Sequence, residues 1–390
     1  MHIGEIQKTL REENIDGWLF FDHHGRDPLA YRVLGLPLGR SLTRRWYYLI
    51  PAHGEPRGIV HAIESGVLNG LPGDIQIYSS WPTQAEGLKR ILAGCRRVAM
   101  QYSPNCAIPY VSLVDAGTIE LVRTSGVEVV TSANLIQLFE SRWSAAQLEM
   151  HLEAGRRVDK IRAAAFQKIG STVGSGGSIT EWEVNRFIRD GFEKAGLVTD
   201  HGPIVGVNAN MSDPHYEPTA ESSQPIRAGD AVLIDMWAKL DQPGSVFYDI
   251  TWTGYCGAAP PTALQNVFEV VRDARNRAVD RVRDAVSQRQ TLHGFEVDDA
   301  ARNYIREKGF GDYFIHRTGH SIGEEVHGTS ANIDNLETHD ERRIIPRTCF
   351  SIEPGVYLPQ FGIRSEVNVY VGEDSAQVTG EVQDRLVAIL

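Results

Sequence analysis

Apolar and polar positions follow two different patterns along the chain, and the change between them falls at Trp143. Before it, helically spaced apolar residues at 3–13 precede the short apolar run GWLFF. The runs RRWYYLIP and RGIVHAI flank AHGEP, which predicts a strand, a turn and a strand. Strand-like and helical stretches continue to alternate up to Trp143. We therefore expect an α/β domain over residues 1–142.

Residues 143–390 follow the pattern of long amphipathic helices and apolar strands. One long helix is predicted from Ser144, and a second opens at Thr180, with Glu183 three residues later as a capping box. Strands follow. Helices over about 262–287 and 295–308 then lead to further strands. The order helix, helix, strands thus occurs twice, which predicts two similar halves without a visible residue-level repeat.

Length and composition agree with two globular domains. The chain has 390 residues, more than one core usually supports, and is 42% hydrophobic and 23% charged. A formal net charge of -11 disfavours a nucleic-acid partner, because such binding needs a basic surface. The polar start and the lack of a long apolar stretch predict no membrane partner. Four widely spaced cysteines predict reduced thiols and a cytoplasmic location.

Two aspartates interrupt apolar runs that should form strands. Asp235 lies in AVLIDMWA and Asp249 in SVFYDITW, although aspartate is depleted from strands and rarely buried unpaired. If the connection turns near Gln242, the two lie opposite one another, or diagonally if a bulge intervenes. Facing carboxylates repel by roughly several tenths of a kcal/mol. A cation is therefore expected between them.

Glu353 and Glu366 repeat this anomaly on either side of the short connection LPQFG. Taken singly, each acid is best explained as exposed or paired, with Arg364 as a partner for either glutamate. Taken together, four carboxylates on two hairpins, one hairpin in each half, can converge, and one imidazole would complete five ligands. Such a set suits two divalent ions about 3.5 to 4 Å apart better than a tetrahedral structural zinc. Oxygen-rich coordination favours Mn, with Co, Zn or Fe as alternatives.

The stretch HRTGHSIGEEVHG at residues 316–328 is the richest in histidine. It lacks the His-Glu-x-x-His order of a zinc-protease helix. Gly319 and Gly323 would also weaken a helix by about 1 kcal/mol each. We predict a loop that contributes to a larger site.

As a set, these motifs resemble those of the pita-bread metallopeptidases, namely prolidase, aminopeptidase P and methionine aminopeptidase, with creatinase as a relative. The resemblance covers roughly residues 143–390, and the first half is similar to the amino-terminal domain of the prolidase and creatinase branch. It implies an α/β creatinase/prolidase-type domain over 1–142 and an α+β pita-bread catalytic domain over 143–390. The metal ligands that it implies are Asp235, Asp249, His320, Glu353 and Glu366.

The resemblance also implies roles for neighbouring residues. His215, in NMSDPHYEP, and His327 match the family histidines that face the substrate, and Arg364 is a further candidate for substrate binding. A metal-bridging hydroxide would attack the scissile carbonyl. Glu353 would accept the proton of the water, and His215 or His327 would stabilise the oxyanion. His215, His327 and Glu353 are therefore the expected catalytic residues, while His316 is expected to be structural.

Three departures from the family pattern are visible. Trp237 stands two positions after the first aspartate, where glycine is usual, and the hairpin between the aspartates is longer than usual. Trp252 occupies a position where many members carry arginine. We expect these changes to reshape one wall of the pocket and to leave the metal ligands in place.

The activity implied by the resemblance is cleavage between an amino-terminal residue and a following proline, by an Xaa-Pro dipeptidase or aminopeptidase acting on a small peptide. The length argues against methionine aminopeptidase, which resembles residues 143–390 alone. A creatinase-like hydrolase of small amides and a noncatalytic binding protein remain alternatives, although in both the ligand set is typically broken.

The resemblance further implies a homodimer, in which the first domain helps to close the partner's pocket. Arg40, Arg44 and Arg45 are candidates for reaching across, with a solvated basic face as the alternative. His23 and His24 form a doublet without a carboxylate cluster at ligand spacing, so a surface loop is expected there.

Overall fold

The computed structural model describes residues 3–39 and 42–390. It divides into two compact units, Met1–Ser141 and Arg142–Leu390, called unit 1 and unit 2 below. Arg40 lies outside the described residues. None of the helices in the described ranges is long and apolar enough to cross a membrane.

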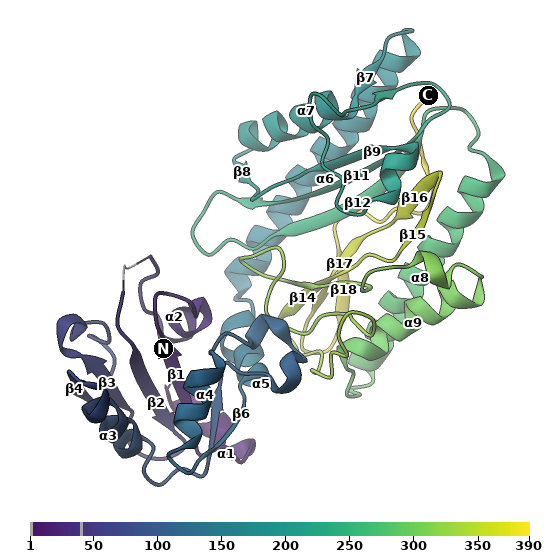
Figure 1. Ribbon diagram of the computed structural model, residues 1–390. Coiled ribbons are helices and arrows are strands. Elements are labelled where there is room, and N and C mark those ends of the chain that lie inside the picture. Colours follow the sequence, from purple (N-terminus) through teal and green to yellow (C-terminus); the bar gives the residue numbers. More distant parts are fainter. Residues whose placement is uncertain (1–2, 40–41) are drawn as a thin grey trace. The chain divides into compact units, whose positions relative to one another are not determined.

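Unit 1 contains one six-stranded sheet in the order β4-β3-β2-β1-β5-β6 (Figure 1). β2 is antiparallel to both of its neighbours, β1 and β3, and the other pairs are parallel. All strands except β2 therefore point the same way, and their carboxyl ends share one edge of the sheet. The strands are β1 (Gly17–Asp22), β2 (Trp46–Pro51), β3 (Arg57–His61), β4 (Asp74–Tyr78), β5 (Arg97–Met100) and β6 (Glu128–Thr131).

The sheet of unit 1 is covered on both faces, which explains why GWLFF is apolar without alternation. Trp18 and Phe20 pack with α1, α2 and α5 on one face. Leu19 and Phe21 pack with α3 and α4 on the other. These helices are α1 (Ile3–Glu12), α2 (Pro28–Leu34), α3 (Trp81–Ile91), α4 (Ala116–Arg123) and α5 (Ala133–Ile136).

Unit 2 begins with the predicted long helix, α6 (Ala145–Gly174), whose cap Ser144 forms a capping box with Gln147. The predicted capping box of Thr180 and Glu183 is confirmed at the start of α7 (Glu181–Lys194). Both helices pack on the sheet that contains β11 and β12. The strands of this half are β7 (Ile179–Thr180), β8 (Leu197–Val198), β9 (Ile204–Val207), β10 (Pro225–Ile226), β11 (Ala231–Leu240) and β12 (Tyr248–Tyr255).

The second half of unit 2 repeats this order with α8 (Thr262–Ser287) and α9 (Gly294–Glu307). α8 and α9 pack against β14 and β17 in the largest apolar cluster. Figure 1 shows the helices of the two halves outside and their strands facing one another inside unit 2. The strands are β13 (Ser321–Ile322), β14 (Thr348–Ile352), β15 (Gly355–Leu358), β16 (Phe361–Arg364), β17 (Val367–Val371), β18 (Ala376–Thr379) and β19 (Val387–Ala388). The predicted two-fold order of elements is therefore present.

Candidate metal centre

The hairpin of β11 and β12 carries the two aspartates on one face. Asp235 pairs with Thr251, and Trp237 pairs with Asp249, so the aspartates are offset by two residues. Because side chains alternate between faces with a period of two, residues 235, 237, 249 and 251 share a face. The diagonal arrangement, one of the two predicted from the sequence, is the one observed.

Glu353 and Glu366 lie where the pair of β14 and β17 ends. The last paired residues are Ile352 and Val367, and Glu353 directly follows Ile352 while Glu366 directly precedes Val367. The strands β15 and β16, which lie between the two glutamates, continue the same antiparallel register, with Gly355 opposite Arg364. Glu353 and Glu366 therefore lie on opposite arms of one interrupted hairpin, as the sequence indicated. A strand pair that splits at this point leaves both side chains free to turn towards β12.

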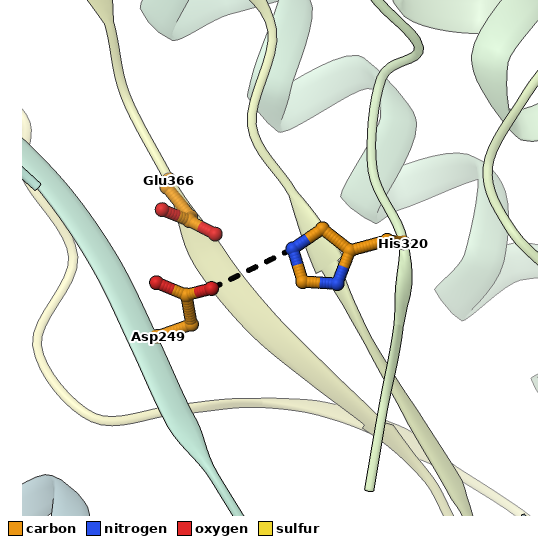
Figure 2. A group of neighbouring side chains, drawn as sticks. All are labelled: Asp249, His320 and Glu366. Atoms are coloured by element: carbon orange, nitrogen blue, oxygen red, sulfur yellow. Dashed lines mark ion pairs between the residues drawn. The ribbon is translucent and has the colours of Figure 1, made fainter. Parts of the chain in front are cut away.

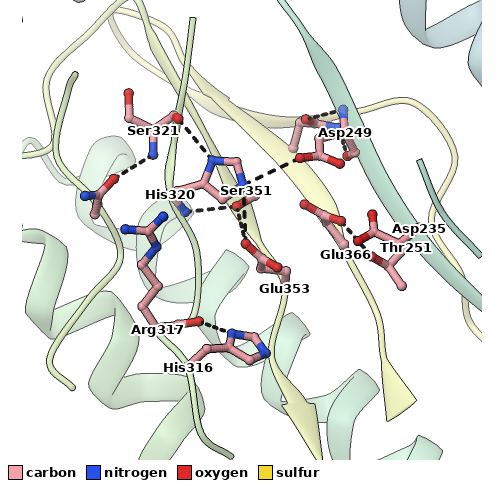
Figure 3. Close-up of polar contacts among 12 residues, drawn as sticks. Asp235, Asp249, Thr251, His316, Arg317, His320, Ser321, Ser351, Glu353 and Glu366 are labelled. Carbon is pink, nitrogen blue, oxygen red and sulfur yellow. Dashed lines mark hydrogen bonds and ion pairs between the residues drawn. The ribbon is translucent and has the colours of Figure 1, made fainter. Parts of the chain in front are cut away.

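His320 is fixed by both its backbone and its ring. Its amide donates to Ser351 Oγ at 2.9 Å, and its Nδ1 lies 3.1 Å from the carbonyl oxygen of Ser321. Nδ1 therefore carries the proton, and the lone pair of Nε2 is directed to the acids. Nε2 lies 3.5 Å from Asp249 Oδ2 and 3.4 Å from Glu353 Oε1 (Figure 3). This is the tautomer that a metal ligand requires.

Asp249, His320 and Glu366 each place one ligand atom within 4.8 Å of the others. Figure 2 shows the three side chains pointing toward one another. Three carboxylate oxygens in this region, Asp235 Oδ1, Asp249 Oδ1 and Glu366 Oε1, are buried without a hydrogen-bond partner. Burial, followed by the charge of Asp235, raises the pKa of Asp249 well above its usual range. Burial and the charge of Asp249 do the same to the pKa of Glu366. Buried, unpartnered and mutually repelling oxygens are what a divalent cation would satisfy, so these residues fit a metal site.

Arg364 lies among the carboxylates, with a side chain that is almost fully buried. Its Nη2 donates to Asp235 Oδ2, and its Nε donates to Thr251 Oγ1 at 3.1 Å. Its Nη1 donates to the hydroxyl of Tyr357 at 2.9 Å. All three guanidinium nitrogens therefore donate a hydrogen bond within the protein. The substrate contact expected of Arg364 stays a prediction.

A directed chain of hydrogen bonds continues from Arg364. The Tyr357 hydroxyl lies 2.7 Å from Nε2 of His316, whose Nδ1 lies 2.6 Å from the carbonyl oxygen of Arg317. Nδ1 must donate to that carbonyl, so Nε2 accepts from Tyr357. Burial lowers the pKa of His316 to about 3, which keeps the ring neutral. The sequence indicated a structural role for His316, and these contacts agree with it.

The two histidines expected to face the substrate are more exposed than His320. The ring of His327 lies edge-on to that of His320, with 4.4 Å between centroids. Electrostatic repulsion between the two neighbouring imidazoles when both are protonated, followed by burial, lowers the pKa of His327. The backbone amide of His215 donates to Asp213 Oδ1 at 3.0 Å, and its ring has no hydrogen-bond partner among the described residues. His327 thus adjoins a candidate ligand, and His215 has an imidazole available for binding.

Two polar residues near the site were missed from the sequence. Thr251 donates through Oγ1 to Glu366 Oε2 at 2.8 Å, and the amide of Glu366 donates to the carbonyl of Thr251 at 3.1 Å. Asn368 accepts from the amide of Asp249 at 3.1 Å and donates to its carbonyl at 2.8 Å. A signal was available, because each residue follows an acid by two positions and therefore shares its face. These hydrogen bonds connect β12 to Glu366 and to β17, the strand that follows Glu366.

Asp200 and His201 were also missed. Asp200 Oδ1 accepts from Nε1 of Trp237 at 2.8 Å and lies 3.0 Å from Nδ1 of His201. The His201 ring packs edge-on against Trp237, with 5.0 Å between centroids. Since Trp237 shares a face with Asp235, this loop adjoins the carboxylate group. In the sequence, the only sign of this contact is Trp237, which stands where the family usually has glycine.

Trp252 does not line the carboxylate group, and the expectation that it reshapes the pocket is corrected. It stands three residues after Asp249, so its side chain leaves the opposite face of β12. There the guanidinium of Arg162 from α6 stacks on the indole, 3.5 Å from its centroid. Trp252 therefore belongs to the packing of α6 on the sheet.

Comparison with known proteins gives a consistent result. A model of metallopeptidase family M24 matches residues 149–373, more than half of the chain. The Xaa-Pro dipeptidase of Lactobacillus delbrueckii subsp. lactis is 28% identical over 232 residues, which cover 59% of this chain and 56% of that protein. The match thus spans little more than half the length of this curated relative.

Two solved structures share the fold over nearly the whole chain. Dipeptidase PepE from Mycobacterium ulcerans has a TM-score of 0.72 and 21% identity, covering 100% of this chain and 97% of its own. The prolidase from Pyrococcus horikoshii OT3 has a TM-score of 0.64 and 22% identity, with 99% of each chain covered. The predicted pita-bread fold is confirmed. The match to the family model, the shared fold and the group of carboxylates around His320 together show that this chain belongs to metallopeptidase family M24.

Proposed function

We propose that this chain is a metal-dependent peptidase that cleaves the bond between an amino-terminal residue and proline. The observation that carries the proposal is the buried group of carboxylates with unpartnered oxygens around Nε2 of His320. M24 metallopeptidases use divalent metals, and we assign two ions to this group. The proposed ligands are Asp235, Asp249, His320, Glu353 and Glu366. Their oxygen-rich set favours Mn over Co, Zn or Fe.

The bound ions would supply a water of lowered pKa and a Lewis acid for the scissile carbonyl. Glu353 is the proposed proton acceptor, because its Oε1 is held by Ser351 Oγ at 3.1 Å beside His320. The same carboxyl would return the proton to the departing nitrogen. His327 and His215 would donate hydrogen bonds to the carbonyl oxygen as it gains charge. We assign Arg364 a positioning role, because it donates a hydrogen bond to Asp235 and its side chain is buried.

Proline is the proposed residue after the scissile bond. The bond to proline lacks the N–H that most peptidases hydrogen-bond, and its ring fixes φ near about -65°. Such a substrate suits a site that needs no hydrogen bond from this N–H and that matches the fixed shape of the proline ring. The name of the Lactobacillus relative, Xaa-Pro dipeptidase, supports this choice. The name of the mycobacterial structure, dipeptidase PepE, supports a second candidate, a dipeptidase without a proline requirement.

Three further assignments belong to this proposal. Residues 1–142 are the creatinase/prolidase-type amino-terminal domain, and residues 143–390 are the catalytic domain. Two chains form a homodimer, as the prolidase branch suggests. The cytoplasm is the proposed location, a choice supported by the free state of the four cysteines.

A substrate panel tests the proposal. Protein stripped with a chelator and reloaded with Mn is assayed on Ala-Pro, Ala-Ala, Met-Ala, a proline-containing tripeptide and creatine. We expect Ala-Pro or the tripeptide to be hydrolysed fastest, with activity lost on chelation and in Glu353→Gln. Faster turnover of Ala-Ala or Met-Ala than of both proline peptides would contradict the proline assignment. Hydrolysis of creatine alone, insensitive to the chelator, would favour the creatinase-like alternative.

A further inference from the structure

A hollow of about 410 Å³ opens in unit 1 at the carboxyl ends of its strands. Phe21, His61 and Tyr78, at or near the ends of β1, β3 and β4, line it. Residues at the starts of α3 and α4, which follow parallel strands, line it as well. Ligands of open α/β sheets bind in crevices outside the carboxyl ends of the strands, and the volume lies within the usual range for small molecules. The hollow is therefore in the position of a ligand site.

Three arginines, Arg26, Arg44 and Arg45, are among the residues that line this hollow. None of the three forms a salt bridge with any residue in the described ranges. Asp115 is the one acid among the lining residues, and it caps α4, accepting from the amide of Thr118 at 2.9 Å and its hydroxyl at 2.8 Å. The positive charge of the hollow thus exceeds its negative charge, although the whole chain carries a net charge of -11.

The loop that carries two of these arginines is held in place. Glu64 accepts from the amide and the hydroxyl of Thr43, both at 2.8 Å, and from the amide of Arg44 at 3.0 Å. The hydroxyl of Tyr78 donates to the carbonyl oxygen of Arg45 at 2.7 Å. Fixing the backbone on both sides lowers the entropy lost when the side chains bind a ligand. These contacts distinguish the loop from an ordinary solvated basic face.

The pKa of His23 responds to the positive charges of the neighbouring arginines. Burial, followed by the charges of His24, Arg26 and Arg45, lowers the pKa of His23, which also lines the hollow. An anion seated there would relieve the same repulsion. Trp81, at the start of α3, completes the rim with a side chain that is 79% exposed. Its flat face is available to a planar group attached to the anion.

We propose that this hollow is a binding site for a small organic anion with two negative charges, a phosphate monoester or a dicarboxylate. Guanidinium forks bind both kinds of group through paired hydrogen bonds, and the amino-terminal end of α3 adds a favourable dipole. The proposal rests on residues of unit 1 alone and does not depend on the peptidase function proposed above. A ligand there would give the amino-terminal domain a binding role of its own.

Calorimetric titration of the full-length, metal-loaded protein tests the site, with phenyl phosphate, inorganic phosphate and succinate as probes. We expect saturable binding of at least one probe, weakened about tenfold or more by Arg26→Gln and by Arg44→Gln. Arg90→Gln, in the last turn of the same helix α3, is the matched control and should change the affinity less than about twofold. Tighter binding of phenyl phosphate than of succinate identifies a phosphate monoester, and the reverse order identifies a dicarboxylate.

A second variant separates the aromatic rim from the charges. Trp81→Leu should weaken phenyl phosphate and leave inorganic phosphate unchanged. Affinity that persists in both arginine variants would place the anion elsewhere, for example on the metals, and would overturn the proposal. Equal losses in Arg90→Gln, or heats that never saturate with any probe, would overturn it too, since they indicate general charge attraction.

Discussion

Arg364 donates to one oxygen of Asp235, and the other oxygen of that carboxylate is buried without a partner. The guanidinium therefore neutralises part of the charge at the site and turns the remaining oxygen towards the other acids. Removing one partner of a buried ion pair leaves the other uncompensated, at a cost of about 3 to 5 kcal/mol.

Arg364→Met should lower the unfolding free energy of the metal-free protein by about that amount, because Asp235 would lose its counter-charge. Arg364→Lys keeps a charge but cannot reach Thr251 and Tyr357 together with Asp235, so it should fall between wild type and Arg364→Met. Denaturant unfolding of the three proteins in chelator measures this order. A methionine variant as stable as wild type would show that the pair adds nothing to folding.

Metal content should separate the ligands from the residues that face the substrate. Asp249→Asn and Glu366→Gln each remove a charged oxygen from the cluster, so we expect lower metal stoichiometry and no activity. His215→Ala should keep its metal and lose turnover, because the ring of His215 is exposed and lies outside the cluster. Elemental analysis after dialysis makes the comparison. The assignment fails if all three variants lose metal equally.

Metal should also stabilise the folded chain. Four acids that repel one another are relieved by cations, and a ligand at 100 times its Kd adds about 2.7 kcal/mol per site to the unfolding free energy. The melting temperature should therefore rise with added Mn and fall with chelator. Glu366→Gln serves as the control and should respond less. Identical melting temperatures with and without Mn in wild type would argue against a metal site.

His151 should make stability depend on pH. Its Nδ1 lies 2.7 Å from the carbonyl oxygen of Phe247 and its Nε2 2.7 Å from Thr379 Oγ1, and burial lowers its pKa to about 4. The unfolded chain, with a histidine pKa of about 6.5, binds more protons between these values. This contribution is therefore complete above pH 6.5 and is lost as the pH falls towards 4. From pH 7 to pH 5 the loss should be about 2 kcal/mol.

The check is the unfolding free energy at pH 7 and pH 5 for wild type, His151→Gln and the exposed control His53→Gln. Carboxylates titrate alike in all three proteins, so the difference between slopes isolates His151. We expect a shallower slope in His151→Gln alone. Parallel slopes would show that the buried ring does not titrate with folding.

Gly155 should tolerate no larger residue, because a Cβ there would lie 2.8 Å from the ring of Tyr248, next to Asp249. Gly155→Ala would push α6 away from β12, at a cost of about 1 to 3 kcal/mol. Gly174→Ala, in the same helix, meets only Leu390 at 3.5 Å, an ordinary contact, and should be neutral or slightly stabilising. Thermal unfolding of both variants measures the difference, and a larger loss in Gly174→Ala would contradict it.

The acids of the site could be located from the sequence because a carboxylate inside an apolar strand is physically anomalous. The register of the strands could not, since the turn between β11 and β12 fits more than one alignment. The placement of Glu353 and Glu366 at the end of a strand pair depends on where β14 and β17 separate, which no local pattern marks. Arg364 illustrates the same limit: its proximity to the acids was expected, but its complete enclosure follows from tertiary packing.

The loop of Asp200 and His201 marks the other limit of sequence reading. It has no periodicity, and its place beside Trp237 depends on contacts between residues 37 positions apart. The helices of unit 2 were easier, because the capping box of Thr180 and Glu183 and the long amphipathic spacing after Ser144 are local signals. Local signals thus predicted the elements, and long-range contacts determined the site.

The double hydrogen bond between Asn368 and the backbone of Asp249 joins strands that belong to different halves of unit 2. The contact of the Glu366 amide with Thr251 crosses the same junction. Neither half can open locally without breaking these bonds and parting the ligands. Proton exchange at the amides of Asp249 and Glu366 would then require the same opening event, so the two amides would report the same opening free energy and slow together when metal binds.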